Sequence, residues 1–235
     1  TLSNFAATSS TVYTATFTPS ASGATTIDVA ADTFTDANGN NNTAATQFNW
    51  TYDGTAPSIS AIATSGFSWG AVLNATEDNS DGTVTVTTSG VEDGQNVTIT
   101  LNGTAYTGSV SSNSATVTIS ASGLQGLTNG QSYTMTADVS DAAGNAATQL
   151  TSSSFTVDTT APTMTIASTT NGVSDGSTTN DSSIALTFTS SEATSNFVEG
   201  DITVSGGTLS NFASTSSTVY TATFTPSASG ATTID

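Results

Sequence analysis

The sequence contains no lysine, arginine, histidine or cysteine, although 18 of its 235 residues are aspartate or glutamate. Without cysteine there is no disulfide framework and no thiol chemistry. Without a basic side chain, no carboxylate is neutralised by a salt bridge, so crowded carboxylates repel each other, shift their pKa or bind a metal ion. The formal charge of -18 also makes nucleic acid and anionic membranes poor partners.

The same absences argue against an enzyme. Acid–base and covalent catalysis draw mostly on histidine, cysteine and lysine, none of which is present. Paired carboxylates alone can cleave glycosides, but the carboxylates here lie in expected turns and linkers. No apolar run approaches the roughly 20 residues that a membrane-spanning helix needs. We therefore expect no catalytic residues, no enzymatic activity and no membrane insertion in this segment.

Apolar residues alternate with serine and threonine between clusters of turn residues. Residues 11–17, Thr-Val-Tyr-Thr-Ala-Thr-Phe, are typical. Alternation with a period of two residues predicts half-buried β-strands, and the aromatic residues set within it argue against a disordered acidic chain. The sequence therefore predicts an all-β fold.

The sequence repeats itself at two distances. Residues 1–28 recur at 208–235, with a single difference between Ala7 and Ser214. The segment Asp-Gly-Thr-Ala-Pro at 53–57 returns at 158–162 as Asp-Thr-Thr-Ala-Pro, about half of that longer distance along the chain. Proline holds the preceding residue extended, so each segment is a short stiff linker between modules. We expect a tandem array in which two unlike domains alternate.

The linkers divide the chain into three parts. Residues 56–160 form one complete module (type 1), with seven short strands that indicate an antiparallel Greek-key β-sandwich. Residues 1–55 are the C-terminal part of a type 2 domain, and residues 161–235 are the N-terminal part of a further type 2 domain. Leu127 stands shortly before Tyr133, at the start of an expected strand, which resembles the tyrosine corner of immunoglobulin-like sandwiches.

Four segments of the complete module together resemble a known family. They are residues 70–77, residues 89–103 (Ser-Gly-Val-Glu-Asp-Gly-Gln-Asn-Val-Thr-Ile-Thr-Leu-Asn-Gly), residues 141–145 and residues 158–162. They are similar to the bacterial immunoglobulin-like tandem repeat, and residues 190–194 and 199–204 resemble a companion type. The resemblance implies tandem immunoglobulin-like sandwiches in an extended array.

Such repeats form the extender regions of giant secreted adhesins, including RTX-type biofilm and ice-binding adhesins, in which calcium stiffens the domain joints. The resemblance therefore implies an extracellular protein of the bacterial cell surface. Its partners would be the neighbouring repeats of one long chain, with surface glycans or other cells met through a distant tip domain.

Carboxylates gather where successive modules join. An Asp-x-x-Gly-Asn loop begins at Asp36 and at Asp141, in each case at the same distance before the aspartate of the following linker. In this sandwich topology we expect one Ca²⁺ site to combine Asp53 of the linker, Glu92 or Asp93, and Asp141 with Asn145. Oxygen ligands of this kind suit Ca²⁺ rather than a transition metal.

The next joint would use Asp158 and Glu192, with Glu77 from the complete module, and a counterpart of Asp36 from a following domain. Asp36 and Asn40 would face a half-domain outside this sequence. A simpler alternative stays open: aspartate, asparagine and glycine favour turns, so each loop is also explained as a turn without metal.

The expected function is mechanical: a calcium-stiffened extender that sets the distance between a cell and a binding tip. One alternative is a glycan- or protein-binding immunoglobulin-like module that uses Trp50 or Trp69. Another is a self-assembling filament or surface-layer subunit, in which partial domains of two chains complete each other by strand exchange. The repeated segment argues against exchange, because both ends of the chain carry the same strands.

Overall fold

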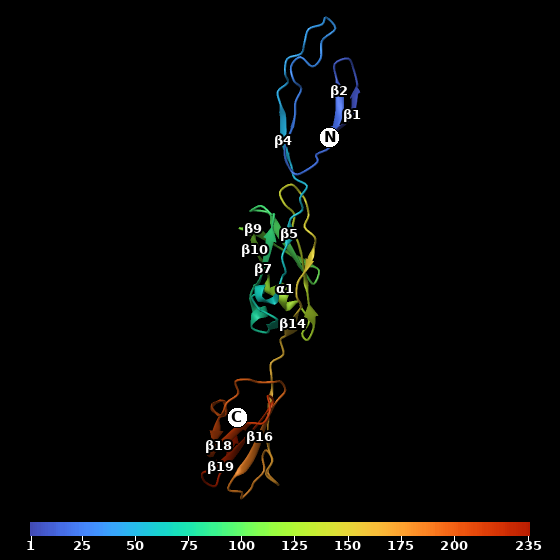
Figure 1. The fold of residues 1–235 in the computed structure, drawn as a ribbon. Coiled ribbons are helices and arrows are strands. Elements are labelled where there is room, and N and C mark those ends of the chain that lie inside the picture. Colours follow the sequence, from blue (N-terminus) through green and yellow to red (C-terminus); the bar gives the residue numbers. More distant parts are fainter. The chain divides into compact units, whose positions relative to one another are not determined.

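The computed structural model describes all 235 residues and consists almost entirely of β-strands. Two compact units are present, residues 1–159 and residues 160–235. The first unit contains a complete sandwich after residue 55 and two hairpins before it (Figure 1). The fold class predicted from the alternation, all-β with immunoglobulin-like sandwiches, is confirmed. No helix combines the length and apolar character required to span a membrane.

The sandwich is built from a seven-stranded and a three-stranded sheet. The strand order of the larger sheet is β13-β12-β8-β9-β10-β7-β5. Its strands are β5 (Ser58–Ile59), β7 (Gly82–Ser89), β8 (Asn96–Leu101), β9 (Thr104–Ser111), β10 (Ser114–Ile119), β12 (Met135–Asp138) and β13 (Leu150–Thr151). The smaller sheet contains β11 (Ser132–Tyr133), β14 (Phe155–Asp158) and β6 (Val72–Asn74), and β14 pairs in parallel with β6.

Alternate side chains of both sheets form one apolar core. Along β7, Val84 and Val86 are fully buried while the intervening Thr85 is exposed, as the sequence pattern predicts. Phe155 of β14 packs edge-on against both Phe67 and Trp69, with ring centroids 5.8 and 5.3 Å away. The short segments η1 (Thr64–Gly66), η2 (Glu77–Asn79) and α1 (Ala121–Gln125) connect strands of the sandwich.

Tyr133 fixes the turn that precedes β11. Its hydroxyl oxygen accepts a hydrogen bond from the main-chain N–H of Thr128 at 2.9 Å, upstream in the sequence. This bond and the one from the side chain of Thr128 lower the pKa of the Tyr133 phenol. The bond to upstream main chain is the contact that the tyrosine-corner resemblance implies.

Residues 1–55 form two hairpins. β1 (Leu2–Ala7) pairs with β2 (Tyr13–Phe17), and β3 (Gly23–Ile27) pairs with β4 (Phe48–Tyr52). β2 has β1 as its only strand partner. Large apolar side chains of this segment are exposed: Leu2, Phe5, Val12, Tyr13, Ile27, Val29, Phe34, Phe48 and Tyr52.

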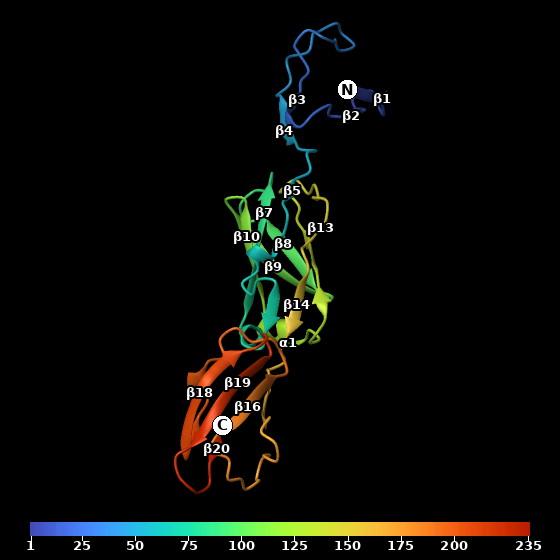
Figure 2. The ribbon, with the colours of Figure 1, turned by 60° about the horizontal axis from the view of Figure 1, so that its bottom comes forward.

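The second unit is a four-stranded sheet in the order β15-β16-β19-β18, with a short additional pair β17-β20 (Figure 2). The strands are β15 (Met164–Ser168), β16 (Ile184–Ser190), β17 (Val204–Ser205), β18 (Gly207–Ser214), β19 (Val219–Pro226) and β20 (Thr233–Ile234). η3 (Glu199–Asp201) precedes β17. Leu186, Phe188, Tyr220, Ala222 and Phe224 are its buried core. The expected division into one complete and two partial domains stays a prediction.

Candidate metal centre at the linker

The two Asp-x-x-Gly-Asn loops adopt the same conformation. Asn145 donates from its main-chain nitrogen to Asp141 Oδ1 at 2.8 Å and from its side-chain amide to Asp141 Oδ2 at 2.9 Å. Asn40 makes the equivalent bonds to Asp36, both at 2.9 Å. The loop glycines have φ angles of +92° at Gly144 and +87° at Gly39, a conformation that glycine adopts without strain. The sequence motif thus forms a closed carboxylate-centred turn.

These bonds stabilise the ionised form of each central carboxylate. The side-chain amide of Asn145 is the main cause that holds the pKa of Asp141 below its ordinary value, with further help from main-chain N–H groups of the loop. Asn40 lowers the pKa of Asp36 in the same way. Asp141 is only 3% exposed, whereas Asp36 lies open to solvent. The structure therefore contains a charged, largely covered carboxylate in a chain that has no basic side chain.

The loop that contains Asp141 is joined to the linker. Asn145 Nδ2 donates a hydrogen bond to the main-chain oxygen of Asp53 at 3.1 Å. The side chain of Asp53 is held within its own segment, where it accepts from the Thr55 N–H at 2.9 Å and from the Ser22 hydroxyl at 3.3 Å. The linker therefore presents a main-chain carbonyl oxygen, rather than the Asp53 carboxylate, to the loop.

Of the two acidic residues expected from the loop between β7 and β8, Glu92 lies at the site. Glu92 Oε2 accepts a hydrogen bond from the Ala142 N–H at 2.8 Å, inside the Asp141 loop. Asp93 turns to the β9–β10 hairpin, where its Oδ1 accepts from the Ser112 N–H at 2.7 Å. The structure thus brings together Glu92, Asp141, Asn145 and the main chain of Asp53.

The chemistry of this group of atoms fits a hard divalent cation. Two carboxylates and one main-chain carbonyl supply oxygens from three separate segments, and the amide nitrogen of Asn145 is bonded to two of these oxygens. Oxygen is the ligand that Ca²⁺ prefers. No group of three or more acidic side chains is close enough anywhere in the structure to hold a metal ion by itself. A cation at this position would therefore depend on carbonyl and water oxygens in addition to the two carboxylates.

The residues expected at the next joint lie in different units. Within the first unit, Asp158 pairs with Asn74 in the parallel β14–β6 ladder, and Glu77 Oε2 accepts from the Asn74 N–H at 3.0 Å. Asp158 and Glu77 therefore lie at the same end of the sandwich. In the second unit, Glu192 is half-buried and donates its N–H to Ser190 Oγ at 3.3 Å. That these residues share a metal ion stays a prediction.

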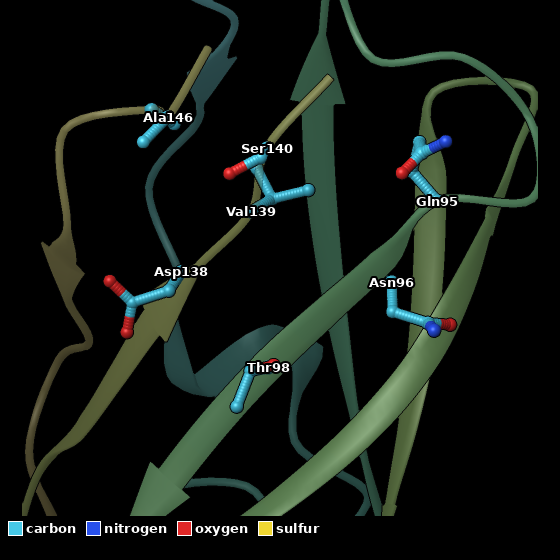
Figure 3. Close-up of a pocket in the computed structure, with 8 residues that line it drawn as sticks. Gln95, Asn96, Thr98, Asp138, Val139, Ser140 and Ala146 are labelled. Atoms are coloured by element: carbon cyan, nitrogen blue, oxygen red, sulfur yellow. The ribbon is translucent and has the colours of Figure 1, made fainter. Parts of the chain in front are cut away.

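A shallow surface hollow of about 320 Å³ adjoins the Asp141 loop and is lined by β8, by β12 and by the residues that flank the loop. Figure 3 shows Asp138 in this hollow with its carboxylate directed away from Asn96. Both oxygens of Asp138 accept hydrogen bonds from Gln149 Nε2, at 3.0 and 2.8 Å. The hollow is therefore mainly an amide- and hydroxyl-lined surface, and its one carboxylate is already bound within the protein.

The linker contains a contact that the sequence did not predict, and a tryptophan considered for ligand binding belongs to the core of the sandwich. Ser22 was not predicted to contribute, yet its hydroxyl lies 2.9 Å from Thr55 Oγ1 and accepts from the Gly54 N–H at 3.0 Å. The only sequence signal was its place in a Pro-Ser-Ala-Ser-Gly turn. Trp69, considered as an exposed ligand-binding aromatic, is 4% exposed and stacks on Phe67 in the core.

Comparison with known proteins gives a family match on both sides of the complete sandwich. The family model described as bacterial Ig-like domain matches residues 1–53 and 158–234. These ranges contain both Asp36 and Glu192 and nearly all of both copies of the repeated segment. No curated protein matches the chain.

Three solved structures are similar to the chain. One, from a 1.5-MDa bacterial ice-binding adhesin, is 27% identical over 59% of this chain and 43% of the other, with a TM-score of 0.34. A Ca²⁺-stabilised adhesin with which an Antarctic bacterium binds ice is 23% identical over 91% and 55% of the two chains, with a TM-score of 0.40. An immunoglobulin-like domain of the M. primoryensis ice-binding adhesin is 30% identical over 43% and 95%, with a TM-score of 0.31. The chain thus spans about half the length of the first two structures.

Proposed function

The chain belongs to the family of bacterial Ig-like domains, and from that premise we propose that it is an extender segment of a secreted bacterial adhesin. Its task would be to hold an adhesive tip at a fixed distance from the cell, with Ca²⁺ stiffening the joints between successive domains. Neighbouring repeats of one long chain would be its principal partners. Contact with glycans or other cells would belong to the distant tip.

The repeated hairpin supports a role in setting length. Residues 2–17 and 209–224 form the same bulged hairpin: Leu2 pairs with Phe17, as Leu209 pairs with Phe224. A domain that recurs almost unchanged is suited to adding length, because distinct recognition tasks would require the exposed side chains to differ between copies. Repeat proteins of this kind extend by adding nearly identical units.

The observation that carries the proposal is the bond from Asn145 to the main-chain oxygen of Asp53. It fastens the linker that leaves one domain to a loop of the next, at the point where an array would bend. A single bond of this kind contributes on the order of 1 kcal/mol, which is small compared with the binding of a divalent ion.

Ca²⁺ would supply the positive charge that the chain itself lacks. The carboxylates of Asp141 and Glu92 and the carbonyl oxygen of Asp53 would hold it, with Asn145 and Ala142 orienting the two carboxylates through the bonds already present. At the following joint Asp158, Glu192 and Glu77 would have the corresponding roles, and Asp36 with Asn40 would meet a preceding linker. Extracellular calcium modules bind at roughly 10⁻⁴ to 10⁻³ M, which suits external fluids rather than cytosol.

Small-angle X-ray scattering of the whole chain tests the proposal. We expect the maximum dimension to be larger in calcium than in excess chelator, because a bent and mobile joint shortens the average end-to-end distance. The double variant Glu92→Gln and Asp141→Asn should behave in calcium like the wild type in chelator. Asp138→Asn removes one negative charge outside the site and should respond to calcium as the wild type does. Scattering profiles that coincide with and without calcium would count against the stiffened joint.

A further inference from the structure

Tension on an extender would pass through the complete sandwich from one linker to the other. The chain enters the sandwich after Pro57 through β5 and leaves it through β14, which ends at Asp158. Figure 1 shows β5 and β14 toward opposite ends of the sandwich. The resistance of the sandwich to stretching therefore depends on the bonds that hold the chain near these two strands.

The entry strand β5 is held by few bonds. It pairs with β7 through two residues, Ser58 and Ile59. Directly after it, the Ser60 N–H donates to the main-chain oxygen of Thr87 at 2.9 Å. Ile59 is only half-buried. We therefore expect β5 to detach at low force and to pass the tension on to the residues that follow it.

The segment between β5 and β6 is held mainly by apolar side chains. Its main-chain bonds to the rest of the sandwich are scattered, as from the Ser68 N–H to the Thr83 oxygen at 2.9 Å. Three of its apolar side chains are buried: Ile62, Phe67 and Trp69. Apolar contacts have no preferred direction and can be lost one side chain at a time as the segment is drawn along its length. Tension would therefore reach β6.

β14 is the central strand of the smaller sheet, whose order is β11-β14-β6. It pairs with β6 in parallel over three consecutive residues, from Thr156 opposite Val72 to Asp158 opposite Asn74. At the start of this ladder the Thr156 N–H donates to the main-chain oxygen of Ala71 at 3.0 Å. The last strand of the sandwich is therefore bonded directly to a strand near the beginning of the module.

The other side of β14 is bonded to residues 129–131. The Val157 N–H donates to the main-chain oxygen of Gln131 at 3.0 Å, and the Val157 oxygen accepts from the Gly130 N–H at 2.8 Å. Beyond the end of β14, Asn129 Oδ1 accepts a hydrogen bond from the Thr159 N–H at 2.8 Å. β14 therefore cannot leave the sheet without breaking bonds along both of its edges.

The parallel direction of β6 and β14 decides how their ladder is strained. The entry linker precedes β6 and the exit linker follows β14, so tension acts on the N-terminal end of β6 and on the C-terminal end of β14. Parallel strands run the same way, so the two are pulled in opposite directions along their common axis. All hydrogen bonds of the ladder are then strained together. In an antiparallel hairpin such as β8–β9, pulling on the two open ends would break the bonds one after another.

We propose that the β6–β14 ladder is the mechanical clamp of the sandwich, that is, the group of bonds that must break before the module unfolds under tension. The proposal rests on the extender function proposed above. Detachment of β5 would lengthen the module slightly at low force, and the sandwich would unfold only when β14 slides past β6. Residues 129–131 would hold β14 in register with β6.

A short ladder can control this process because forced unfolding is governed by the unfolding rate rather than by the equilibrium stability. Most of the stability of the sandwich comes from its apolar core, to which three pairs of main-chain residues add little. Under tension, however, these pairs lie directly between the two linkers. The ladder would therefore determine the force at which the sandwich unfolds without determining its stability in urea.

A reversible disulfide across the ladder tests the clamp, because the chain has no cysteine of its own. Val72→Cys and Thr156→Cys lie opposite each other in the ladder, and both side chains are exposed. Neighbouring strands lie about 4.8 Å apart, within the Cα separations that a disulfide spans. The whole chain is joined to DNA handles through peptide tags at its two ends. It is stretched in optical tweezers in excess chelator, first oxidised and then reduced.

In the reduced protein we expect a high-force step that releases most of the roughly 100 residues of the sandwich, up to about 35 nm of extended chain. The second unit has fewer residues and gives a shorter step. In the oxidised protein the ladder cannot open, so the high-force step should disappear. The remaining steps of the sandwich should occur at least about twofold lower in force, because fewer hydrogen bonds are strained together.

A second disulfide provides the matched control. Thr98→Cys and Thr107→Cys lie opposite each other in β8 and β9, outside the β6–β14 ladder. Their disulfide should shorten the step slightly and leave its force unchanged. The wild type, which forms no disulfide, gives the reference force.

Three results would overturn the proposal. One is a step at the same high force in the oxidised Val72→Cys/Thr156→Cys protein, which would place the resistance outside the ladder. The others are a wild type that unfolds without a high-force step, and a control disulfide that removes the step as well. Since the measurement is made in chelator, none of these results depends on the calcium joint, which the scattering experiment tests separately.

Discussion

Asn145 and Asp53 are 92 residues apart in the sequence, yet the side-chain amide of the first donates to the main-chain oxygen of the second at 3.1 Å. The same asparagine closes the turn around Asp141. One side chain therefore closes the loop by hydrogen bonds to Asp141 and also binds the loop to the linker. The Asp36–Asn40 turn has the hydrogen bonds within the loop without the bond to a linker, so the two turns can be compared directly.

Asn145→Ala should destabilise the complete sandwich more than Asn40→Ala destabilises its own segment. Removal of the Asn145 amide leaves the covered Asp141 carboxylate and the Asp53 carbonyl short of a donor, at a cost of about 1–3 kcal/mol in the free energy of unfolding. Asn40 is exposed, so water replaces its amide and the expected loss is below about 1 kcal/mol. Urea unfolding of both variants, followed by the fluorescence of Trp69 for the sandwich and of Trp50 for the segment of Asn40, each with the other tryptophan replaced by phenylalanine, measures the difference. Equal losses would mean that the bond to the linker contributes nothing.

Calcium should raise the thermal stability of the chain through the linker site. With a dissociation constant near 1 mM, 10 mM Ca²⁺ would stabilise the folded form by about 1.4 kcal/mol, or several degrees in Tm. Differential scanning calorimetry in calcium and in chelator measures this shift. Glu92→Gln and Asp141→Asn should each reduce the shift, whereas Asp93→Asn should retain it because Asp93 is bound to the β9–β10 hairpin. A shift that is the same in all three variants would point to general screening of the negative charge.

Acid should weaken the Asp141 turn. Because the pKa of Asp141 is lower in the folded chain than its ordinary value of about 3.9, the turn contributes stability above that value and loses it as the pH falls through the folded pKa. Protonation of other carboxylates acts in the opposite direction by relieving repulsion, so the wild type alone is not informative. The stability difference between wild type and Asp141→Asn, measured by urea unfolding in chelator, should be constant from pH 7 to 5 and shrink below about pH 4. A difference independent of pH would show that the charge of Asp141 has no part in the turn.

Much of the sandwich follows from local sequence, because alternation along a strand records which side chains face the core. Val84 and Val86 of β7 and Phe155 of β14 were recognisable in this way. β6 was not, because Val72–Asn74 is too short to alternate and exists only through its parallel pairing with β14. The strand expected to start at Tyr133 divides after that residue, since β11 pairs with β14 in one sheet and β12 pairs with β8 in the other. Pairing between distant strands leaves no local pattern.

At the candidate site, too, the local contacts follow from the sequence and the long-range contact does not. The Asp-x-x-Gly-Asn motif indicated the closed turn because every bond within it is local. The expected sandwich topology also indicated Glu92 or Asp93 beside Asp141 and Asn145, and of these two acidic residues Glu92 contacts the loop. The sequence did not predict that Asp53 offers its main-chain carbonyl to the loop. Its carboxylate is held by Ser22 and Thr55, and the contact with Ser22 joins distant parts of the sequence, which no local pattern records.

The stiffness of the joint is measured most directly by the distance between two spin labels on either side of the linker. The absence of native cysteine allows Thr26→Cys in β3 and Thr116→Cys in β10 to be labelled uniquely, and both positions are exposed. Double electron–electron resonance should give a narrow distance distribution in calcium that broadens in chelator, with Glu92→Gln/Asp141→Asn broad in both. A distribution of the same width in calcium and in chelator would contradict a calcium-stiffened extender.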